Sequence, residues 1–490
     1  MNNPVRLRLA PSPTGEPHVG NIRTAIFNWL YARHHKGALV IRVEDTDQGR
    51  KVQGSTEQML DALNWLGIDW DEGPDVGGIF GPYFQSQRLE LYNSIADQLL
   101  DSGRAYYCYC SSERLTLLRQ EQSAKKENPG YDGRCRYIAK RDVGRDKLSD
   151  VKPVIRFRML EEGNTVVDDV IRGRVVTENN LFDDYIMIKS DGFPTYHMAS
   201  VVDDHYMQIS HVMRGEEWLP STPRHVQLYQ ALGWIPPKFV HLPIILARDK
   251  SKLSKRHGVT SILEYKAKGY VPQAMVNFLT LLGWSLDGST ELFSVNELVD
   301  NFSLDRISKS GAIFDAEKLN WMNGHYIRSM DEEELGRLLL RYWDEFPITD
   351  IPKVEPSTLI TDISSLIQER LKILSDAAPL IKFFFCDEAK YEASELIQKG
   401  MDVDGTKLIL SSSLSALEEV TEFTSDSIEA SLRGLSAKLD VKVGQLLGTL
   451  RVATTGLKVS PPLFQSMEIS GKKRIIKDIQ LAMNRLSVKN

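Results

Sequence analysis

Two short segments, far apart in the chain, carry residue types that could bind a phosphorylated substrate. The first is Arg8-Leu-Ala-Pro-Ser-Pro-Thr-Gly-Glu-Pro-His-Val-Gly-Asn21, a proline-rich stretch between an expected strand and an expected helix. His18 and Gly20 fall in the first helical turn, where free backbone N–H groups and the positive end of the helix dipole favour an anion. Gly20 has no Cβ, so a bulky ligand could lie directly on that turn. The segment is typical of a nucleoside triphosphate site, although strand–loop–helix junctions occur in every α/β protein.

The second segment is Lys252-Leu-Ser-Lys-Arg256, which directly follows an apolar stretch at His241–Leu246. Three cations and a hydroxyl in five residues supply donors for phosphate oxygens. We expect Leu253 to bury its side chain and anchor this loop. A Lys/Arg cluster alone is usually a solvated surface. Together, however, the two segments predict one crevice, in which the first holds the base and phosphate end of a nucleotide and the second clamps its triphosphate.

The elements that must position these residues alternate between strand and helix patterns. Val5–Ala10 alternates as a strand does, and Ala38–Val43 is a nearly continuous apolar strand of the kind buried in parallel sheets. The helix between them should end near His35, with Gly37 placed to stop it. A capping-box pattern at Ser55–Gln58 opens the next helix. Glu44 follows the second strand, where carboxylates face the ligand crevice of a doubly wound sheet or are simply solvated.

The rest of the chain predicts an α/β fold: a Rossmann-like doubly wound parallel sheet with an α+β insertion, followed by an all-α C-terminal half. Buried strands return at Tyr185–Ile188, and no clear strand is expected beyond about residue 260. The expected units are the first half of the sheet domain at 1–103, the insertion at 104–190, the second half of the sheet domain at 191–260, a helical domain at 261–325 and an all-α domain at 326–490.

Composition narrows the class of protein. The chain has 490 residues, 42% of them hydrophobic and 26% charged, and a net charge of −6, so it is not basic overall as many nucleic-acid-binding proteins are. The N-terminus lacks the apolar core of a signal peptide, and no apolar run approaches the roughly 18 residues that span a bilayer. Its four cysteines, three of them close in sequence, suit a reducing compartment and a metal site better than disulfides. We therefore expect a cytoplasmic protein without a membrane segment.

The two segments resemble the signatures of class I aminoacyl-tRNA synthetases. His18-Val-Gly-Asn21 is similar to the His-Ile-Gly-His signature, and Lys252-Leu-Ser-Lys-Arg256 to the Lys-Met-Ser-Lys-Ser signature, with departures at Asn21, Leu253 and Arg256. Further segments resemble the bacterial glutamyl-tRNA synthetases; they are Arg8-x-Ala-Pro-Ser-Pro-Thr-Gly15, Arg42-Val-Glu-Asp-Thr-Asp47, Asp69-Trp-Asp-Glu-Gly-Pro74, Pro194-Thr-Tyr196 and Arg214-Gly-Glu-Glu-Trp218. The resemblance is strong to about residue 328 and diffuse beyond.

This resemblance implies a two-step reaction for protein synthesis. Glutamate and ATP give glutamyl-adenylate and pyrophosphate, and the glutamyl group then moves to the terminal adenosine of tRNA(Glu). Neither step needs a covalent enzyme intermediate, so catalysis should rest on positioning and charge neutralisation, which Mg²⁺ would share. The family's pattern assigns the acceptor end of the tRNA to 104–190, its stem to 261–325 and its anticodon to 326–490. It implies a monomer.

The family's pattern also implies the site residues. Stabilisation of the charge on pyrophosphate would come from His18, Gly20, Lys252 and Lys255. Residues implied for ATP are Pro11, His18, Gly20, Asn21, Glu217, Ile245, Lys252, Leu253, Ser254, Lys255 and Arg256. Those implied for glutamate are Arg8, Ala10, Ser12, Glu44, Tyr196, Ser200 and Arg214. Arg8 is expected to bind the γ-carboxylate and Glu44 the α-ammonium group.

Two further sites are expected outside the crevice. Cys108, Cys110 and Cys135 suit a structural zinc ion, and the family's zinc-bearing members place a His where this chain has Tyr137, which makes Tyr137 the candidate fourth ligand. Three merely buried thiols are the alternative. Arg370 is a candidate reader of the anticodon, the alternative being an ion pair on a helix surface.

Three other functions fit parts of the pattern. A shorter relative that glutamylates a modified tRNA base lacks the helical half that 326–490 supplies here. A glutaminyl enzyme of bacterial type usually ends in β-barrels, for which few strands are visible. A non-catalytic RNA-binding paralogue would be free to lose His18, Glu44 or Lys255, and all three are present. Whether tRNA(Gln) is also charged stays open.

Overall fold

The computed structural model describes residues 4–137, 152–347 and 359–487. The chain forms two compact units. The first contains residues 1–265 and 272–316, and the second contains 266–271 and 317–490. The range 261–325, expected as one helical domain, is thus shared between the two units. Each unit is described by itself.

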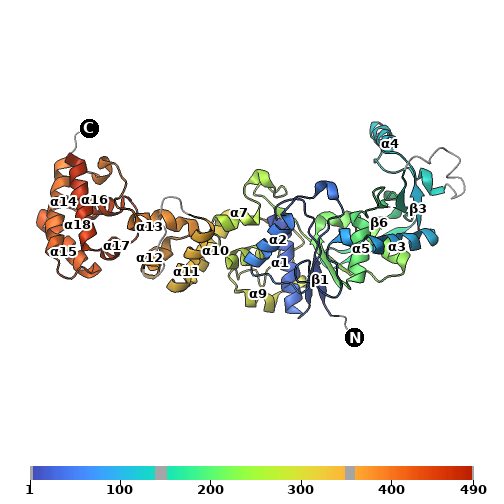
Figure 1. Ribbon diagram of the computed structural model, residues 1–490, viewed down its shortest axis with the longest axis horizontal. Helices are drawn as coiled ribbons and strands as arrows, with labels where there is room; N and C mark the ends of the chain where they lie inside the picture. Colours follow the sequence, from blue (N-terminus) through green and yellow to red (C-terminus); the bar gives the residue numbers. More distant parts are fainter. Residues whose placement is uncertain (1–3, 138–151, 348–358, 488–490) are drawn as a thin grey trace. The chain divides into compact units, whose positions relative to one another are not determined.

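The first unit is built on a parallel sheet. β1 (Arg6–Leu9) pairs with β2 (Ala38–Ile41), and β8 (His211–Gly215) pairs with β9 (Lys238–Leu242), both in parallel. The start of β8 is joined to β1 by the Ser210 amide, which donates to the Arg6 carbonyl at 2.9 Å. α1 (Val19–His34) connects β1 to β2 and packs on the sheet (Figure 1). The predicted Rossmann-like βαβ start is therefore confirmed.

Two local predictions about this region need correction. The left-handed residue that follows α1 is Lys36 (φ 51) and not Gly37, although the Gly37 amide does donate to the Ala32 carbonyl at 2.8 Å. Glycine is required at position 37 because a Cβ there would lie 2.3 Å from the Val5 carbonyl oxygen. Ser55 does not form a capping box, because α2 (Ser55–Trp65) begins at Ser55 itself after Gly54 in the left-handed region. The Ser55 hydroxyl instead donates to the Gly15 carbonyl at 2.6 Å and so holds the proline-rich loop.

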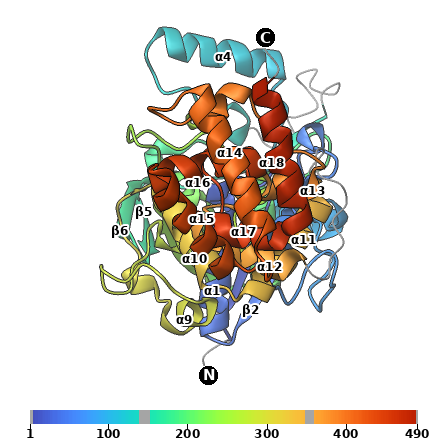
Figure 2. The same cartoon turned by 90° about the vertical axis from the view of Figure 1, so that its left-hand side faces the viewer.

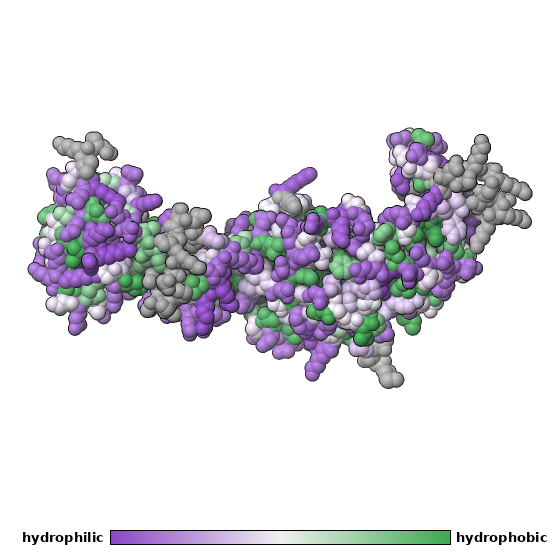
Figure 3. Space-filling model, viewed as in Figure 1, coloured by the Kyte–Doolittle hydropathy of each residue, from purple (hydrophilic) through white to green (hydrophobic). Residues whose placement is uncertain are grey.

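The inserted module has its own antiparallel sheet of β3 (Ala105–Cys108), β4 (Val154–Phe157) and β7 (Ile186–Ile188). The expected strand at Tyr185–Ile188 thus belongs to the module and not to the parallel sheet. α4 (Ser112–Ala124) has no buried side chain, stands out from the module in Figure 1 and is mostly hydrophilic in Figure 3.

A hairpin within the range expected for the insertion, 104–190, extends the main sheet instead. β5 (Asn164–Asp169) pairs with β6 (Gly173–Glu178), and Asp169 pairs in parallel with Phe239 of β9. The strand order of this sheet is β6-β5-β9-β8, so it is mixed rather than purely parallel.

The segment His241–Leu246 was expected to be one strand, but it is divided at Pro243, whose nitrogen cannot donate to a ladder. The second piece, β10 (Ile245–Leu246), pairs with β11 (Ala312–Ile313), which corrects the expectation of no strand beyond about residue 260. The other helices of the first unit are α3 (Leu89–Asp101), α5 (Tyr196–Tyr206), α6 (Thr222–Leu232), α7 (Ile262–Ala267), α8 (Pro272–Leu281) and α9 (Val295–Asn301).

In the described part of the second unit every regular element is helical, as the sequence predicted. Its helices are α10 (Ala316–Ser329), α11 (Glu332–Glu345), α12 (Leu359–Ile367), α13 (Ala377–Phe385), α14 (Val403–Glu418), α15 (Ser425–Leu439), α16 (Val443–Thr455), α17 (Leu463–Ser470) and α18 (Lys472–Ser487). α14 and α18 lie side by side (Figure 2) around a core that includes Leu410, Leu450 and Ile479. Among the described residues, no helix is both long and apolar enough to span a lipid bilayer.

Candidate active site

A cavity of about 700 Å³ opens at the carboxyl ends of β1 and β8. Both chemical segments identified from sequence line it, so the prediction that they face one crevice is confirmed. The predicted residues that line it are Arg8, Ala10, Pro11, Ser12, His18, Gly20, Asn21, Glu44, Tyr196, Arg214, Glu217, Ile245, Lys252, Leu253 and Ser254.

The carbonyl oxygens of the three prolines in the proline-rich loop accept hydrogen bonds from backbone amides elsewhere in the chain. The Pro11 carbonyl accepts from the Glu44 amide at 3.0 Å, that of Pro13 from the Val52 amide at 2.8 Å, and that of Pro17 from the Ile262 amide at 3.0 Å. Three separate segments of the chain therefore hold this loop, which bends over residues 13–16.

His18 is the N-cap residue of α1, one position before the first helical turn. The Gly20 amide donates to His18 Nδ1 at 3.0 Å. Because Nδ1 is an acceptor, a neutral ring carries its proton on Nε2 and can donate it to an oxygen. A Cβ on residue 20 would lie 3.3 Å from His18 Nδ1, a tight contact that glycine avoids.

The second segment is anchored at its start and exposed beyond it. The Leu253 amide donates to the Ile245 carbonyl at 2.9 Å, and the Leu253 side chain is buried, as predicted. Lys252 is exposed, with Nζ 3.4 Å from Glu217 Oε1. The Ser254 hydroxyl lies 3.0 Å from His257 Nδ1. Arg256 is exposed and does not line the cavity, and the side chain of Lys255 lies outside the described part of the structure.

At the inner end of the cavity, Arg8 and Glu44 belong to a buried network of charges. Asp204 Oδ1 accepts from Arg8 Nε at 3.0 Å and from Arg42 Nη1 at 2.7 Å. Arg42 Nη2 in turn donates to Glu44 Oε1 at 3.1 Å. Arg42 is completely buried and Arg8 is 4% exposed, so neither is a surface residue.

The network sets the charge states of its members. Burial favours the neutral form of Arg42, but Asp204, Asp203 and Glu44 outweigh it and hold the Arg42 pKa well above its ordinary value. Burial raises the pKa of Glu44, although Arg42 and Arg8 oppose that shift. Burial also favours a neutral Asp204, but Arg8 and Arg42 outweigh it and lower the Asp204 pKa.

Asp203, a third carboxylate near Arg42, is held by three further side chains. Its carboxylate accepts from Arg88 Nε at 2.7 Å, from the Tyr92 hydroxyl at 2.8 Å and from the Gln85 amide at 2.9 Å. These partners all lie within residues 85–92, more than a hundred residues before Asp203 in the chain. Asp203, Asp204 and Arg88 were not predicted, because only the folded chain brings them to Arg42.

Arg214 differs from Arg8 because its protein partners are neutral. Its Nε donates to His241 Nε2 at 3.1 Å, Nη1 to the Tyr196 hydroxyl at 2.8 Å and Nη2 to the Thr222 hydroxyl at 2.9 Å. Among the described residues, no carboxylate oxygen lies within 4 Å of this guanidinium, which is only 6% exposed. A buried cation without a carboxylate partner needs an anion from elsewhere.

The charge on the described lining residues also favours an anionic ligand. The cationic side chains are those of Arg8, Arg23, Arg50, Arg214 and Lys252, whereas the carboxylates are only Glu44 and Glu217. Arg23 was not predicted; it is buried, and burial lowers its pKa to about 10 while Glu217 and Glu216 oppose the shift.

Two other residues differ from expectation. Ser200 is buried and does not line the cavity; its hydroxyl lies 3.5 Å from Arg42 Nη2, so it contacts the charge network instead. Trp218 lines the cavity, with its ring centroid 4.5 Å from that of Tyr196. Trp218 ends the Arg214-Gly-Glu-Glu-Trp218 segment, which was the only signal for it in the sequence.

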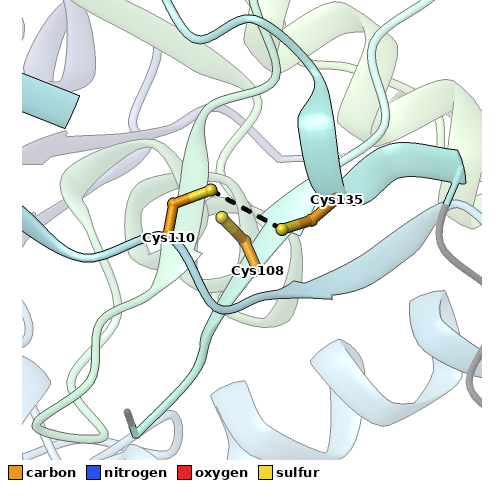
Figure 4. A group of neighbouring side chains, drawn as sticks. All are labelled: Cys108, Cys110 and Cys135. Atoms are coloured by element: carbon orange, nitrogen blue, oxygen red, sulfur yellow. Dashed lines mark hydrogen bonds between the residues drawn. The ribbon is translucent and has the colours of Figure 1, made fainter. Parts of the chain in front are cut away.

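The three neighbouring cysteines of the inserted module converge (Figure 4). Their sulfur atoms all lie within 4.8 Å of one another, and Cys110 Sγ is 3.6 Å from Cys135 Sγ. A tetrahedral zinc ion with Zn–S bonds of about 2.3 Å sets its sulfurs about 3.8 Å apart, so the cluster fits zinc. Hydrogen bonds from Cys110 and Cys135 lower the pKa of the Cys108 thiol.

A tyrosine approaches this cluster, but it is not the predicted one. Tyr137 is 73% exposed and its hydroxyl donates to Glu161 at 2.9 Å, so its position gives no support to a ligand role. The Tyr131 hydroxyl lies 3.4 Å from Cys108 Sγ and 3.9 Å from Cys110 Sγ. The spacing in the family's zinc-bearing members implied a ligand at residue 137, but Tyr137 ends a 3-10 helix, Arg134–Tyr137, and is exposed there.

In the second unit, Arg370 lies at the end of a 3-10 helix, Gln368–Arg370, and not within an α-helix as expected. Its side chain is exposed. Burial lowers the pKa of the half-buried Arg451, and the charge of Arg370 adds to that shift.

Comparison with known proteins gives a family for both parts of the chain. Residues 4–321 match the model for tRNA synthetases class I (E and Q), catalytic domain, and residues 334–483 match an anticodon binding domain. A glutamate–tRNA ligase of Dehalococcoides mccartyi is 51% identical over 487 residues, with 99% of each chain covered. That of Moorella thermoacetica is 44% identical over 475 residues, with 97% of each chain covered.

Solved structures agree with this assignment. The crystal structure of a glutamate tRNA ligase from Elizabethkingia meningosepticum in complex with its amino acid has a TM-score of 0.87 at 34% identity, covering 98% of this chain and 99% of that one. A glutamate-tRNA synthetase from Elizabethkingia anophelis has a TM-score of 0.84 at 34% identity, covering 98% and 100%. The chain therefore belongs to the glutamate–tRNA ligases of the class I tRNA synthetases.

Proposed function

We propose that this chain activates glutamate with ATP and transfers the glutamyl group to the terminal adenosine of tRNA(Glu). The observation that carries the proposal is a single cavity with the two class I signatures on its wall and a buried arginine that has no carboxylate partner among the described residues. Glutamate supplies the missing anion, and ATP supplies the phosphates that the signature segments bind. Such an enzyme acts in the cytoplasm, where proteins are made, and we propose that it does so as a monomer.

The amino acid is bound at the inner end of the cavity. Arg214 keeps two of its five N–H donors for the ligand after its three hydrogen bonds to the protein, which suits a carboxylate bound through both oxygens. Arg8 adds a second cation at the same wall. Glu44 is held by Arg42 and accepts from the α-ammonium group. Ser12, Ala10 and Tyr196 complete the pocket, whereas Ser200 acts through Arg42.

ATP is bound between the two signature segments. His18 Nε2–H and the backbone N–H groups near Gly20 donate to phosphate oxygens, and Lys252 leaves Glu217 to pair with the outer phosphates. An oxygen of the glutamate α-carboxylate attacks the α-phosphorus, the bond to pyrophosphate breaks, and the donors neutralise the charge that the leaving group gains. Lys255 and Ser254 also donate to the phosphate oxygens and help to neutralise the charge on pyrophosphate. The remaining proposed ATP contacts are Pro11, Asn21, Ile245, Leu253 and Arg256.

Mg²⁺ would enter with ATP, since this ion binds mainly phosphates and water and needs few protein ligands. The carboxylate of Glu217, which lines the cavity beside Lys252, is the described group that could reach its hydration shell. When bound, the ion adds charge neutralisation at the phosphates.

The other parts of the chain position the tRNA. We propose that the module at 104–190 holds the acceptor end, that 261–325 contacts the stem and that 326–490 reads the anticodon, with Arg370 as one candidate contact. Cys108, Cys110 and Cys135 would hold a structural zinc ion that keeps the module folded. The converging sulfur atoms support this role.

Aminoacylation of purified tRNA(Glu) and tRNA(Gln) with glutamate, glutamine and aspartate tests the function. We expect charging of tRNA(Glu) with glutamate only, and the same assay decides whether tRNA(Gln) is a second substrate. ATP–pyrophosphate exchange is measured in parallel with and without tRNA, and we expect it to require tRNA. Charging with glutamine in place of glutamate, or no charging at all, would overturn the proposal.

A further inference from the structure

Two buried residues behind Arg214 have no part in the mechanism above. His241 on β9 is completely buried, and Asp169 at the end of β5 is 5% exposed. Neither lines the cavity. They are nevertheless joined to it, because His241 Nδ1 lies 2.7 Å from Asp169 Oδ2 while His241 Nε2 accepts from Arg214 Nε at 3.1 Å.

Strand register creates this line of side chains. Arg214 of β8 is paired with His241 of β9, and Asp169 of β5 is paired with Phe239 two residues earlier on β9. Asp169 therefore sits on one flank of His241 and Arg214 on the other. The other oxygen of Asp169 accepts from the Ile171 amide at 3.0 Å and the Arg172 amide at 2.8 Å, which fixes the carboxylate.

The hydrogen bonds determine which nitrogen of His241 carries the proton. Arginine Nε–H is only a donor, so His241 Nε2 must be the acceptor and the proton of a neutral ring must be on Nδ1, where it donates to Asp169. Burial lowers the pKa of His241, although Asp169 opposes the shift, which keeps the ring neutral. A proton on Nε2 would instead face the N–H of Arg214 at 3.1 Å and would have to be accepted by the Thr222 hydroxyl, 3.2 Å from Nε2.

We propose that Asp169 and His241 are positioning residues that orient Arg214 for one carboxylate of the amino acid substrate. The inference rests on the proposed function, because it assigns that substrate to the cavity. Asp169 fixes the His241 tautomer, His241 fixes Arg214 Nε, and Thr222 and Tyr196 fix the two remaining nitrogens. The guanidinium plane is thereby set before the ligand arrives, which reduces the loss of side-chain entropy on binding.

Asp169→Asn separates this role from simple packing. The amide oxygen can stay with the Ile171 and Arg172 N–H groups, so the NH₂ group takes the place of the oxygen that accepts from the His241 amide and from His241 Nδ1. Facing Nδ1, it drives the ring proton to Nε2, against Arg214. We expect the KM for glutamate to rise roughly 10- to 100-fold, the scale of losing a hydrogen bond to a charged group, while the KM for ATP changes less than about twofold. The control is Glu72→Gln, which removes another buried carboxylate, paired with Arg6 at 2.9 Å and lining no part of the cavity.

Two substitutions of His241 should raise the KM for glutamate to different extents. In His241→Gln the side-chain oxygen can take the place of Nε2 and still accept from Arg214, whereas His241→Leu offers no acceptor. We expect the KM for glutamate to increase from wild type to His241→Gln to His241→Leu, with the KM for ATP unchanged, all in aminoacylation assays on the full chain. Thermal melting of each variant is measured beside Glu72→Gln.

The outcomes are distinct. If wild type does not charge tRNA with glutamate, the proposed function fails. If wild type does so but Asp169→Asn keeps its glutamate KM, or raises the KM for glutamate and ATP equally, the positioning role is wrong. The same conclusion follows if Glu72→Gln changes the glutamate KM as much as Asp169→Asn does.

Discussion

The Nε of Arg8 lies 3.0 Å from Oδ1 of Asp204, and both side chains are 4% exposed. The sequence predicted Arg8 as the partner of the substrate's γ-carboxylate. The structure instead gives Arg8 a carboxylate of its own, which Arg42 shares. Arg214, with neutral partners only among the described residues, is the stronger anion site.

Asp204→Asn should destabilise the first unit. It removes one charge from a buried group of three arginines and three carboxylates, and breaking a buried ion pair in this way costs about 3–5 kcal/mol. Because the folded-state pKa of Asp204 is lowered, its contribution is present above the unfolded-state value near 3.8 and is lost as the pH falls through the lowered pKa. Urea unfolding at pH 7 measures the loss. The control, Asp315→Asn, removes a pair with Arg248 that is about half exposed and should cost less than about 1 kcal/mol.

Glu44→Gln should weaken glutamate binding without lowering the stability of the folded chain at pH 7. Burial raises the pKa of Glu44, so its contribution to stability is fully present below the unfolded-state value near 4.5 and is lost as the pH rises through the raised pKa. At pH 7 the variant should thus be at least as stable as wild type, and the stability of wild type relative to the variant should increase as the pH is lowered from 7 toward the unfolded-state value near 4.5. The variant should nevertheless have a higher KM for glutamate, because it lacks the acceptor for the ammonium group. A variant clearly less stable than wild type at pH 7 would contradict this.

Prediction from sequence succeeded where one continuous segment carries both the fold and the chemistry. Arg8, Ser12, His18 and Gly20 lie on one loop after one strand, so their common cavity follows from local order. Glu44 could be placed because the carboxyl end of a parallel strand faces the crevice. The pairing of Asp204 with Arg8 could not be predicted, since it depends on α5 crossing the sheet nearly two hundred residues later.

Local misreadings have equally local causes. Ser55 has the residue type of a helix cap, but its hydroxyl is engaged by Gly15 of the proline-rich loop. The strand β5 was missed, and with it Asp169, because its pairing with β9 is set by tertiary contacts and not by its own pattern. His241 was placed in a strand, but its role depends on two neighbours across the sheet.

Arg214→Met and Arg8→Met should weaken glutamate binding by different routes. Replacing Arg214 removes a buried charge that has no carboxylate partner among the described residues, so stability should be unchanged or slightly higher. Replacing Arg8 leaves Arg42 as the one cation paired with Asp204 among the residues that the structure describes, and should lower stability. Both variants should raise the KM for glutamate by about 100-fold or more, since a charged hydrogen-bond pair is lost. Thermal melting together with steady-state kinetics tests the contrast, which fails if Arg214→Met is the less stable of the two.

Lys255→Met should slow the activation step. If its ammonium group acts mainly on the charge that pyrophosphate gains in the transition state, kcat should fall by roughly 10²–10³ with little change in the KM for ATP. Lys250→Met is the matched control on the same loop, because Lys250 is exposed and does not line the cavity. Single-turnover formation of glutamyl-adenylate in the presence of tRNA is the measurement. An effect confined to the KM for ATP would show that Lys255 binds the ground state and transition state equally.

Tyr131→Phe and Tyr137→Phe should differ in their effect on zinc. The Tyr131 hydroxyl approaches Cys108 and Cys110, whereas that of Tyr137 donates to Glu161 at the surface. Purified wild-type protein should contain about one zinc ion per chain, held by three thiolates. Because structural zinc sites take four ligands, we expect the fourth ligand on the side of the cluster that Tyr131 approaches. Cys110→Ser should remove the ion, Tyr131→Phe should lower its affinity, and Tyr137→Phe should retain it. Elemental analysis with competition by a chelator measures all three. A wild-type protein without zinc would show that the three cysteines are metal-free thiols. Equal zinc affinity in the two tyrosine variants would show that Tyr131 only packs against the cluster.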